Sequence, residues 1–336
     1  MSAVIDLAVV WSGILAFAVF AYVVLDGFDL GIGILTPLAH SEEEEETMIG
    51  AIAPVWDGNE TWLVLGGGGL MAAFPLAYAV LLPALYAPLI AMLLALIFRG
   101  VAFEFRHRSP AHRRAWTWGF VLGSYVATFA QGLALGTVIQ GIEVSGRAYA
   151  GGWFDWLTPF SLLTGAALLF GYALLGACFL IMKTGGYLQE RMFGLALPLA
   201  VAVLGFIVVV SVWTPFLSPD LRERWFSWPN IAVLSPAPLL VAAIAIGLFR
   251  ALAKGREGTP FLMTILLFLT AYAGIGVSVY PYIVPRAVTV WEAAAPDESL
   301  LFLLVGTAIL IPIILAYTCY SYWVFRGKVE STQGYR

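Results

Sequence analysis

Long apolar segments separated by short polar breaks dominate the chain. A membrane-spanning helix needs about 20 apolar residues, and nine segments meet this requirement. They lie at about 7–35, 49–72, 75–101, 115–141, 157–182, 193–217, 231–253, 259–284 and 299–325. The breaks contain turn-forming pairs such as Ser109-Pro110 and Gly185-Gly186. The pattern predicts an all-α polytopic membrane protein with nine transmembrane helices.

The composition supports this class. The chain is 61% hydrophobic and 11% charged, with a mean hydropathy of +0.90, whereas soluble domains contain about 25% charged residues. The first apolar segment follows no basic stretch and continues too far for a cleavable signal peptide. We see no separate soluble domain, so we treat residues 1–336 as one transmembrane domain in a lipid bilayer.

Lysine and arginine set the expected orientation, because cytoplasmic loops are enriched in both. Of the 17 basic residues, 13 fall on one side, in the loops after the third, fifth and seventh segments and in the tail that ends at Arg336. This distribution predicts an external N-terminus and a cytoplasmic C-terminus. The acidic run Glu42–Glu46 falls on the cytoplasmic side, and we interpret it as a solvated loop.

Four acidic residues lie inside the first two apolar segments. They are Asp26 and Asp29 in VVLDGFDLGIG, and Asp57 and Glu60 in APVWDGNETW, where Trp56 and Asn59 stand beside them. A carboxylate at the centre of a bilayer costs about 2.5–3.5 kcal/mol on insertion scales. Such residues within spans usually mark function, so these acids are the candidate site.

Helical geometry places the acids close together. Asp29 lies six residues before the end of the first segment, roughly 9 Å, and Asp57 lies eight residues into the second, roughly 12 Å. Adjacent antiparallel helices would therefore hold these two acids at similar depth. Asp26 with Asp29, and Asp57 with Glu60, are pairs three residues apart, which share a helix face.

Neither of these two segments contains a cation, so the four acids cannot all be ionised at low cost. Burial and like-charge repulsion both favour the protonated form, which suits a proton relay. The alternative is structural: the acids cap broken helices or bond across helices, where Gly27, Gly31 and Gly33 permit close packing. The residues alone leave both interpretations open.

Other polar residues in the spans carry weaker signals. Arg99 and Arg106, in FRGVAFEFR, either contact lipid headgroups or form salt bridges with acids of a neighbouring helix. Gln131 and Gln140 in the fourth segment are interpreted by default as interhelical packing residues, with a role as hydrogen-bonding partners as the alternative. The run Gly66–Gly69 lacks the lysine and hydroxyl residue of a phosphate-binding loop, which argues against nucleotide binding.

The positions of the histidines argue against a haem site. His40, His107 and His112 all fall in loops, whereas membrane haem normally takes His, Met or Cys as axial ligands. No set of His, Cys and Asp has the spacing of metal ligands. We therefore predict that this chain holds no redox cofactor and no metal, and that it has no nucleic-acid partner.

Four motifs resemble subunit II of cytochrome bd-type quinol oxidases. They are VLDGFDLGIGIL at 24–35, APVWDGNETWL at 53–63, the glycine run followed by AAFP at 72–75, and LIFRGVAFEFR at 96–106. The segment at 309–325 resembles the last helix of the family, so the similarity covers essentially the whole chain. The modest length and a compact loop after the sixth segment resemble the short, cyanide-insensitive branch.

The resemblance implies two four-helix bundles, here 1–142 and 157–284, plus a peripheral last helix at 299–326. It implies a heterodimer with subunit I, which carries haems b558, b595 and d, and in some members a small accessory subunit. The complex resides in the bacterial inner membrane, oxidises quinol and reduces dioxygen to water. It is electrogenic without pumping, because its chemical protons come from the cytoplasm. Some members also bind a structural quinone in subunit II.

The family's proton path includes acids of the first two helices. These match Asp29 and Asp57 here, with Asp26, Trp56, Asn59 and Glu60 as supporting residues. We therefore predict a non-haem subunit that stabilises the haem subunit and conducts protons. The alternative is a proton-coupled secondary transporter, which would have interrupted helices in both halves, whereas these acids lie in one. A purely structural membrane partner is the third possibility.

Overall fold

The computed structural model describes residues 6–329, so Arg336 and the first five residues of the predicted 1–142 bundle lie outside the described range. The longer helices are α1 (Leu7–Leu35), α3 (Trp56–Ala73), α4 (Pro75–Ala84), α5 (Tyr86–Arg108), α6 (Arg113–Gln140), α7 (Pro159–Lys183), α8 (Gly186–Trp213), α11 (Pro236–Ala253), α12 (Thr259–Val279) and α14 (Asp297–Val324). Short helices are α2 (Glu42–Gly50), α9 (Pro219–Phe226), α10 (Asn230–Leu234) and α13 (Val290–Ala293). Two antiparallel hairpins pair β1 (Val144–Ser145) with β2 (Ala148–Tyr149), and β3 (Tyr282–Val284) with β4 (Val288–Thr289).

Eight helical stretches within residues 6–329 are long and apolar enough to cross a membrane. They contain α1, α5, α6, α7, α8, α11, α12 and α14. The prediction of an all-α polytopic membrane protein is therefore confirmed. The predicted second segment contains α3, whose polar first turns leave it outside this set. The predicted third segment is divided, because the helix breaks at Leu85 between α4 and α5.

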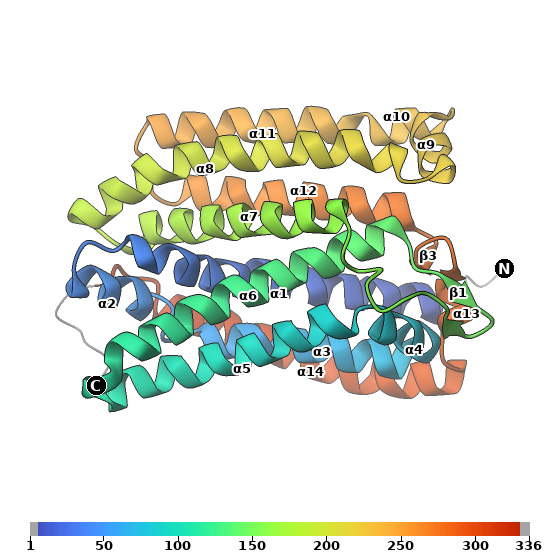
Figure 1. Cartoon of the computed structure of the whole chain (residues 1–336), viewed down its shortest axis with the longest axis horizontal. Helices are drawn as coiled ribbons and strands as arrows, with labels where there is room; N and C mark the ends of the chain where they lie inside the picture. Colours follow the sequence, from blue (N-terminus) through green and yellow to red (C-terminus); the bar gives the residue numbers. More distant parts are fainter. Residues whose placement is uncertain (1–5, 330–336) are drawn as a thin grey trace.

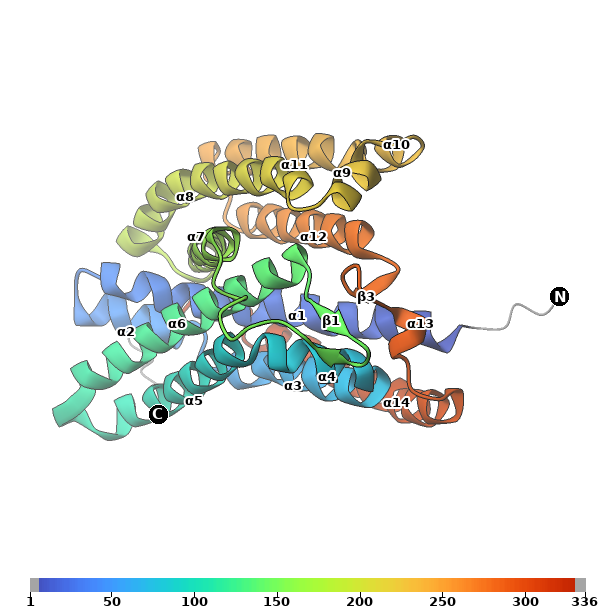
Figure 2. The same ribbon diagram turned by 45° about the vertical axis from the view of Figure 1, so that its right-hand side comes forward.

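The long helices lie side by side in layers (Figure 1). One outer layer contains α8 and α11, the next α7 and α12, and a central layer follows with α1 and α6. On the far side lie α3, α4, α5 and α14, and the same order is visible after a 45° turn (Figure 2). The short helices α9, α10 and α13 and the hairpins gather at one end, and α2 lies at the other.

Helix α1 is the most enclosed element in its second half, where every residue from Asp26 to Leu35 is buried. A small-residue seam explains this burial, because a Cβ on Gly31 would lie only 1.8 Å from the carbonyl oxygen of Tyr172. A Cβ on Gly33 would likewise lie 2.0 Å from the hydroxyl of Ser124. Glycine thus lets α6 and α7 approach α1 closely, and both acids of α1 are enclosed as a result.

The acidic run Glu42–Glu46 forms most of α2, so its interpretation as a solvated loop is wrong. Ser41 caps the helix by accepting a hydrogen bond from the backbone N–H of Glu44, and acids favour the positive end of the helix dipole. We call the following pairs the acidic clamp. It joins Glu44 to Arg191 of α8, Glu45 to Arg106 of α5, and Glu46 to Arg113 of α6. The clamp fastens α2 to the ends of three other helices.

Candidate functional site

A single arginine of α5 holds acids from two other helices. The Nη1 atom of Arg99 donates to Asp26 Oδ1 at 2.9 Å and to Glu60 Oε1 at 2.6 Å. The side chains of Arg99 and Asp26 are 1% and 0% exposed, and that of Glu60 is 25% exposed. Of the two interpretations left open for Arg99, the structure shows the salt bridge to acids of neighbouring helices. Its burial excludes the alternative contact of this arginine with lipid headgroups.

Asp29 faces an amide that is held from both ends. Asn59 Nδ2 donates to Asp29 Oδ2 at 2.7 Å and to the carbonyl oxygen of Leu25 at 3.2 Å. The hydroxyl of Tyr322 in α14 donates to Asn59 Oδ1 at 2.9 Å. These bonds fix the orientation of the amide, so that Asp29 receives an N–H. The other carboxyl oxygen of Asp29, Oδ1, is buried without a hydrogen-bond partner within residues 6–329.

We call Asp26, Asp29 and Glu60, with Arg99 and Asn59, the carboxyl cluster. Three ionised carboxyls and one guanidinium would give it a formal charge of −2 (three negative, one positive). Uncompensated charges in a low-dielectric interior are strongly unfavourable. The cluster reaches neutrality when two of its carboxyls retain protons. This arrangement can therefore store protons and exchange them between adjacent groups.

Asp57 lies outside the carboxyl cluster. It is exposed on the first turn of α3, whereas Asn59, two residues later, is 1% exposed and faces Asp29. The rotation of α3 therefore directs Glu60 to Arg99 and leaves Asp57 at the surface of the isolated chain. Trp56 is half-buried, and its ring lies 5.0 Å from that of Phe103, measured between ring centroids.

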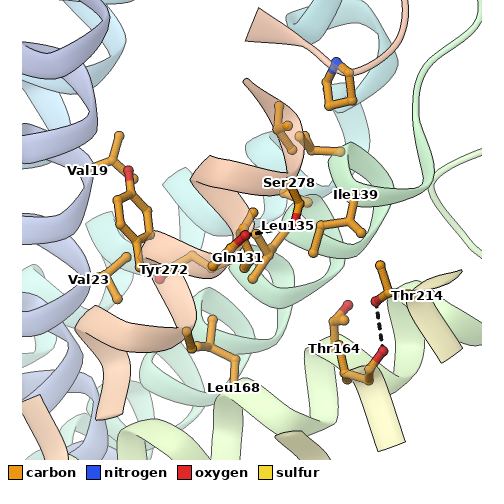
Figure 3. Close-up of a pocket in the computed structure, with 18 of the residues that line it drawn as sticks. Val19, Val23, Gln131, Leu135, Ile139, Thr164, Leu168, Thr214, Tyr272 and Ser278 are labelled. Atoms are coloured by element: carbon orange, nitrogen blue, oxygen red, sulfur yellow. Dashed lines mark hydrogen bonds between the residues drawn. The ribbon is translucent and has the colours of Figure 1, made fainter. Parts of the chain in front are cut away.

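A large cavity lies beside the cluster and is lined by residues of α1 and of every helix from α3 to α12. It has a volume of about 2390 Å³ and a mostly apolar lining, and it continues to Arg224 and Arg286 at the end of the molecule opposite α2. Figure 3 shows Gln131 in its wall, with Val19 and Val23 of α1 on one side. We call this space the lateral cavity. In the described part of the chain, no group of three or more His, Cys, Asp or Glu could hold a metal ion.

Residues 7–325 match the family described as cytochrome bd terminal oxidase subunit II. The chain belongs to this family. It is 29% identical over 357 residues to cytochrome bd-I ubiquinol oxidase subunit 2 of Escherichia coli (strain K12), covering 95% of this chain and 94% of the relative. It is 30% identical over 333 residues to cytochrome bd ubiquinol oxidase subunit 2 of Bacillus subtilis (strain 168), covering 95% and 96%.

A solved structure shares the fold. The bd oxidase from Geobacillus thermodenitrificans contains a chain that superposes with a TM-score of 0.78 at 16% identity, covering 95% of this chain and 98% of that one. The resemblance to subunit II seen in the motifs is thus confirmed. Membership of a subunit II family implies a complex with a catalytic subunit I. Together with the apolar helices, it indicates a multi-pass protein of the bacterial inner membrane. The comparisons do not favour the transporter alternative.

Two tyrosines near the site could not be recognised from the sequence. Tyr322 reaches Asn59 across 263 residues of sequence, and Tyr22 belongs to an apolar stretch in which nothing marks its partner. The tail motif YTCYSYW contains three tyrosines, but only the rotation of α14 decides which of them turns inward.

Proposed function

We propose that this chain is the non-haem subunit of a quinol:oxygen oxidoreductase, in which it stabilises subunit I and carries protons toward the oxygen-reducing site. The observation that supports the proton path is the acid excess of the carboxyl cluster. A purely structural network needs only matched charges, because each unpaired buried carboxylate is unfavourable. A site with more carboxyls than cations must bind protons, which gives it the composition of a relay.

The path of the chain supports nine membrane crossings, with α3 as the ninth. Pairs of the acidic clamp hold both α2 and the end of α5 at one end of the molecule. The other end of α3 lies beside the start of α14, because the backbone N–H of Ala295 donates to the carbonyl oxygen of Ala73. Since α1 and α5 both end near α2, α3 has to return between them. This path also fits two four-helix bundles with α14 at the periphery.

We place the end that carries α2 in the cytoplasm. The acidic clamp there contains Arg106, Arg113 and Arg191, and Lys328 pairs with Glu257 after the last helix. The enrichment of cytoplasmic loops in lysine and arginine then gives a periplasmic N-terminus and a cytoplasmic C-terminus. Protons would enter from the α2 end.

The face formed by α3, α5 and α14 is the proposed contact with subunit I. Asp57 is exposed there at membrane depth, where lipid contact would be costly, and a protein partner would shield it. Large apolar side chains are also exposed on these helices, among them Val64, Met71, Leu94, Ile97, Phe302 and Ile309. In this arrangement Asp29 and Asp57 are the proton carriers, and Asp26, Trp56, Asn59 and Glu60 support them.

The redox cofactors of the proposed complex belong to its partner. We assign haems b558, b595 and d to subunit I, together with quinol oxidation, and a small accessory subunit completes the complex in some members of the family. Because the chemical protons come from the cytoplasm, turnover is electrogenic without pumping. The lateral cavity fits the isoprenoid chain of a structural quinone, which apolar residues such as Val23, Leu168 and Phe268 would hold. A quinone there would fill space between α1 and α12.

The test compares conservative variants of the two carriers. Asp29→Asn and Asp57→Asn keep the side-chain shape and remove the titratable proton. We expect the complex to assemble with a normal haem spectrum and quinol-driven oxygen consumption to fall by about 100-fold, the scale of a lost proton-transfer group. Asp297→Asn, at the exposed start of α14, is the control. Wild-type turnover in both variants would remove the relay role. Failed assembly of Asp57→Leu alongside active Asp57→Asn would favour a structural role for Asp57.

A further inference from the structure

A hydrogen-bonded ladder of three side chains adjoins the carboxyl cluster. Gln131 Nε2 of α6 donates to the hydroxyl of Tyr22 in α1 at 2.8 Å, and the hydroxyl of Tyr172 in α7 donates to Gln131 Oε1 at 2.9 Å. Tyr22 and Tyr172 are 4% and 0% exposed, and Gln131 is half-buried. We call these three residues the tyrosine–glutamine ladder.

The ladder leads from the cluster to the cavity wall. Tyr22 lies one turn before Asp26 on α1, so the two side chains share a helix face. Because Tyr22 accepts from the amide of Gln131, its own hydrogen remains available to donate toward Asp26 Oδ2, which has no hydrogen-bond partner within residues 6–329. At the other end, all three ladder residues contribute to the lining of the lateral cavity, and Figure 3 shows Gln131 among the lining side chains.

Where it holds water instead of a quinone chain, the lateral cavity would offer protons a route to the opposite face of the membrane. It extends from the level of Val23 to Arg224 and Arg286, beyond the outer ends of α6 and α12. A proton that left Asp26 through the ladder would therefore reach the side away from α2. Such a leak would dissipate the gradient that turnover builds.

The amide in the ladder does not carry protons. Phenols and carboxyls transfer protons, but a glutamine amide has a fixed N–H donor and a fixed C=O acceptor, with no proton that titrates near neutral pH. Gln131 therefore satisfies both tyrosines while it interrupts proton transfer between them. We propose that Gln131 is an insulating residue, which confines the protons of the carboxyl cluster to the side of α3 and α5. This inference rests on the proposed proton path.

The decisive experiment converts the amide into a proton carrier of the same shape. Gln131→Glu and the control Gln140→Glu are made in the two-subunit oxidase and reconstituted in liposomes that contain a pH-sensitive dye. Gln140 lies on the same helix but bonds to Thr158, away from the cluster. An imposed pH gradient, without quinol, should decay several-fold faster in Gln131→Glu than in wild type. Gln140→Glu should retain the wild-type decay rate and turnover.

Two further variants keep the test decisive. Gln131→His introduces a different proton carrier and replaces Gln131→Glu if the latter does not assemble. Gln131→Met fills similar space without a carrier and should not leak. The proposal is overturned if the assembled carrier variants hold the gradient as wild type does, or if Gln131→Met leaks as fast as they do. The Asp29→Asn turnover reports separately on the proton path, because the leak assay involves no turnover.

Discussion

The carboxyl cluster and the acidic clamp use the same chemical groups in different proportions. In the clamp, each of three glutamates of α2 has its own arginine, supplied by α5, α6 or α8. In the cluster, Arg99 pairs with both Asp26 and Glu60, and the third carboxyl, that of Asp29, has an amide instead of a cation as its partner. The clamp lies at the end of the molecule, with its glutamate side chains 15% to 46% exposed, whereas Asp26 and Asp29 are fully buried.

The comparison shows that the ratio of carboxyls to arginines determines which role the same residue types have. In the acidic clamp, each glutamate pairs with one arginine near the surface. Such pairs hold helices in place without binding protons. An acid excess in the interior favours bound protons, because within residues 6–329 Arg99 is the one cation that pairs with the carboxyls of the cluster. Removing an arginine should therefore have very different effects in the two regions.

The largest effect is expected for Arg99→Leu. The change leaves Asp26 and Glu60 without their cation in the interior, and breaking a buried pair in this way costs about 3–5 kcal/mol. We expect little assembled complex, measured as the yield of haem-containing oxidase after purification. The double variant Arg99→Leu with Asp26→Leu should recover part of the yield, since it removes one of the stranded acids. A wild-type yield of Arg99→Leu would contradict the central place of this arginine.

Arg106→Leu tests the clamp at its most buried point. Arg106 is 1% exposed, but its partner Glu45 is partly exposed and keeps the hydrogen bond from the hydroxyl of Thr117, at 2.9 Å. We expect a loss of about 1–3 kcal/mol, the scale for a group that loses its partner, seen as a lower melting temperature of the purified complex. Turnover should remain normal. A loss of assembly equal to that of Arg99→Leu would erase the distinction between the two regions.

Tyr322→Phe probes how firmly the cluster is oriented. Without its hydroxyl, Asn59 Oδ1 loses one donor, at a cost of about 1 kcal/mol, and the amide that faces Asp29 is less well fixed. We expect turnover to fall several-fold while the apparent KM for quinol stays constant. Tyr320→Phe, on the exposed side of the same helix, is the matched control. Equal turnover in both variants would mean that Tyr322 only fills space.

Much of the fold followed from hydropathy alone, and the acids of α1 were identified as a site by their unfavourable position in an apolar segment. The pattern could not tell that Asn59, rather than Asp57, faces Asp29. The rotation of α3 decides this, and its small residues Gly66–Gly69 leave no clear apolar face from which to read it. The helical form of Glu42–Glu46 also escaped prediction, because its stability depends on arginines that lie 61 to 147 residues away in sequence.

The smallest effect is expected for Arg113→Gln at the outer pair of the clamp. The side chains of Arg113 and Glu46 are 30% and 46% exposed, and exposed pairs contribute about 0–1 kcal/mol. The melting temperature of the complex should shift by about 2 °C or less, and the shift should vanish in 1 M salt, where the Debye length is about 3 Å. Turnover should equal that of wild type. A shift equal to that of Arg106→Leu, or one that persisted in high salt, would show that this pair stabilises the complex as much as the buried pair does. Side-chain exposure would then not determine how much each pair of the clamp contributes.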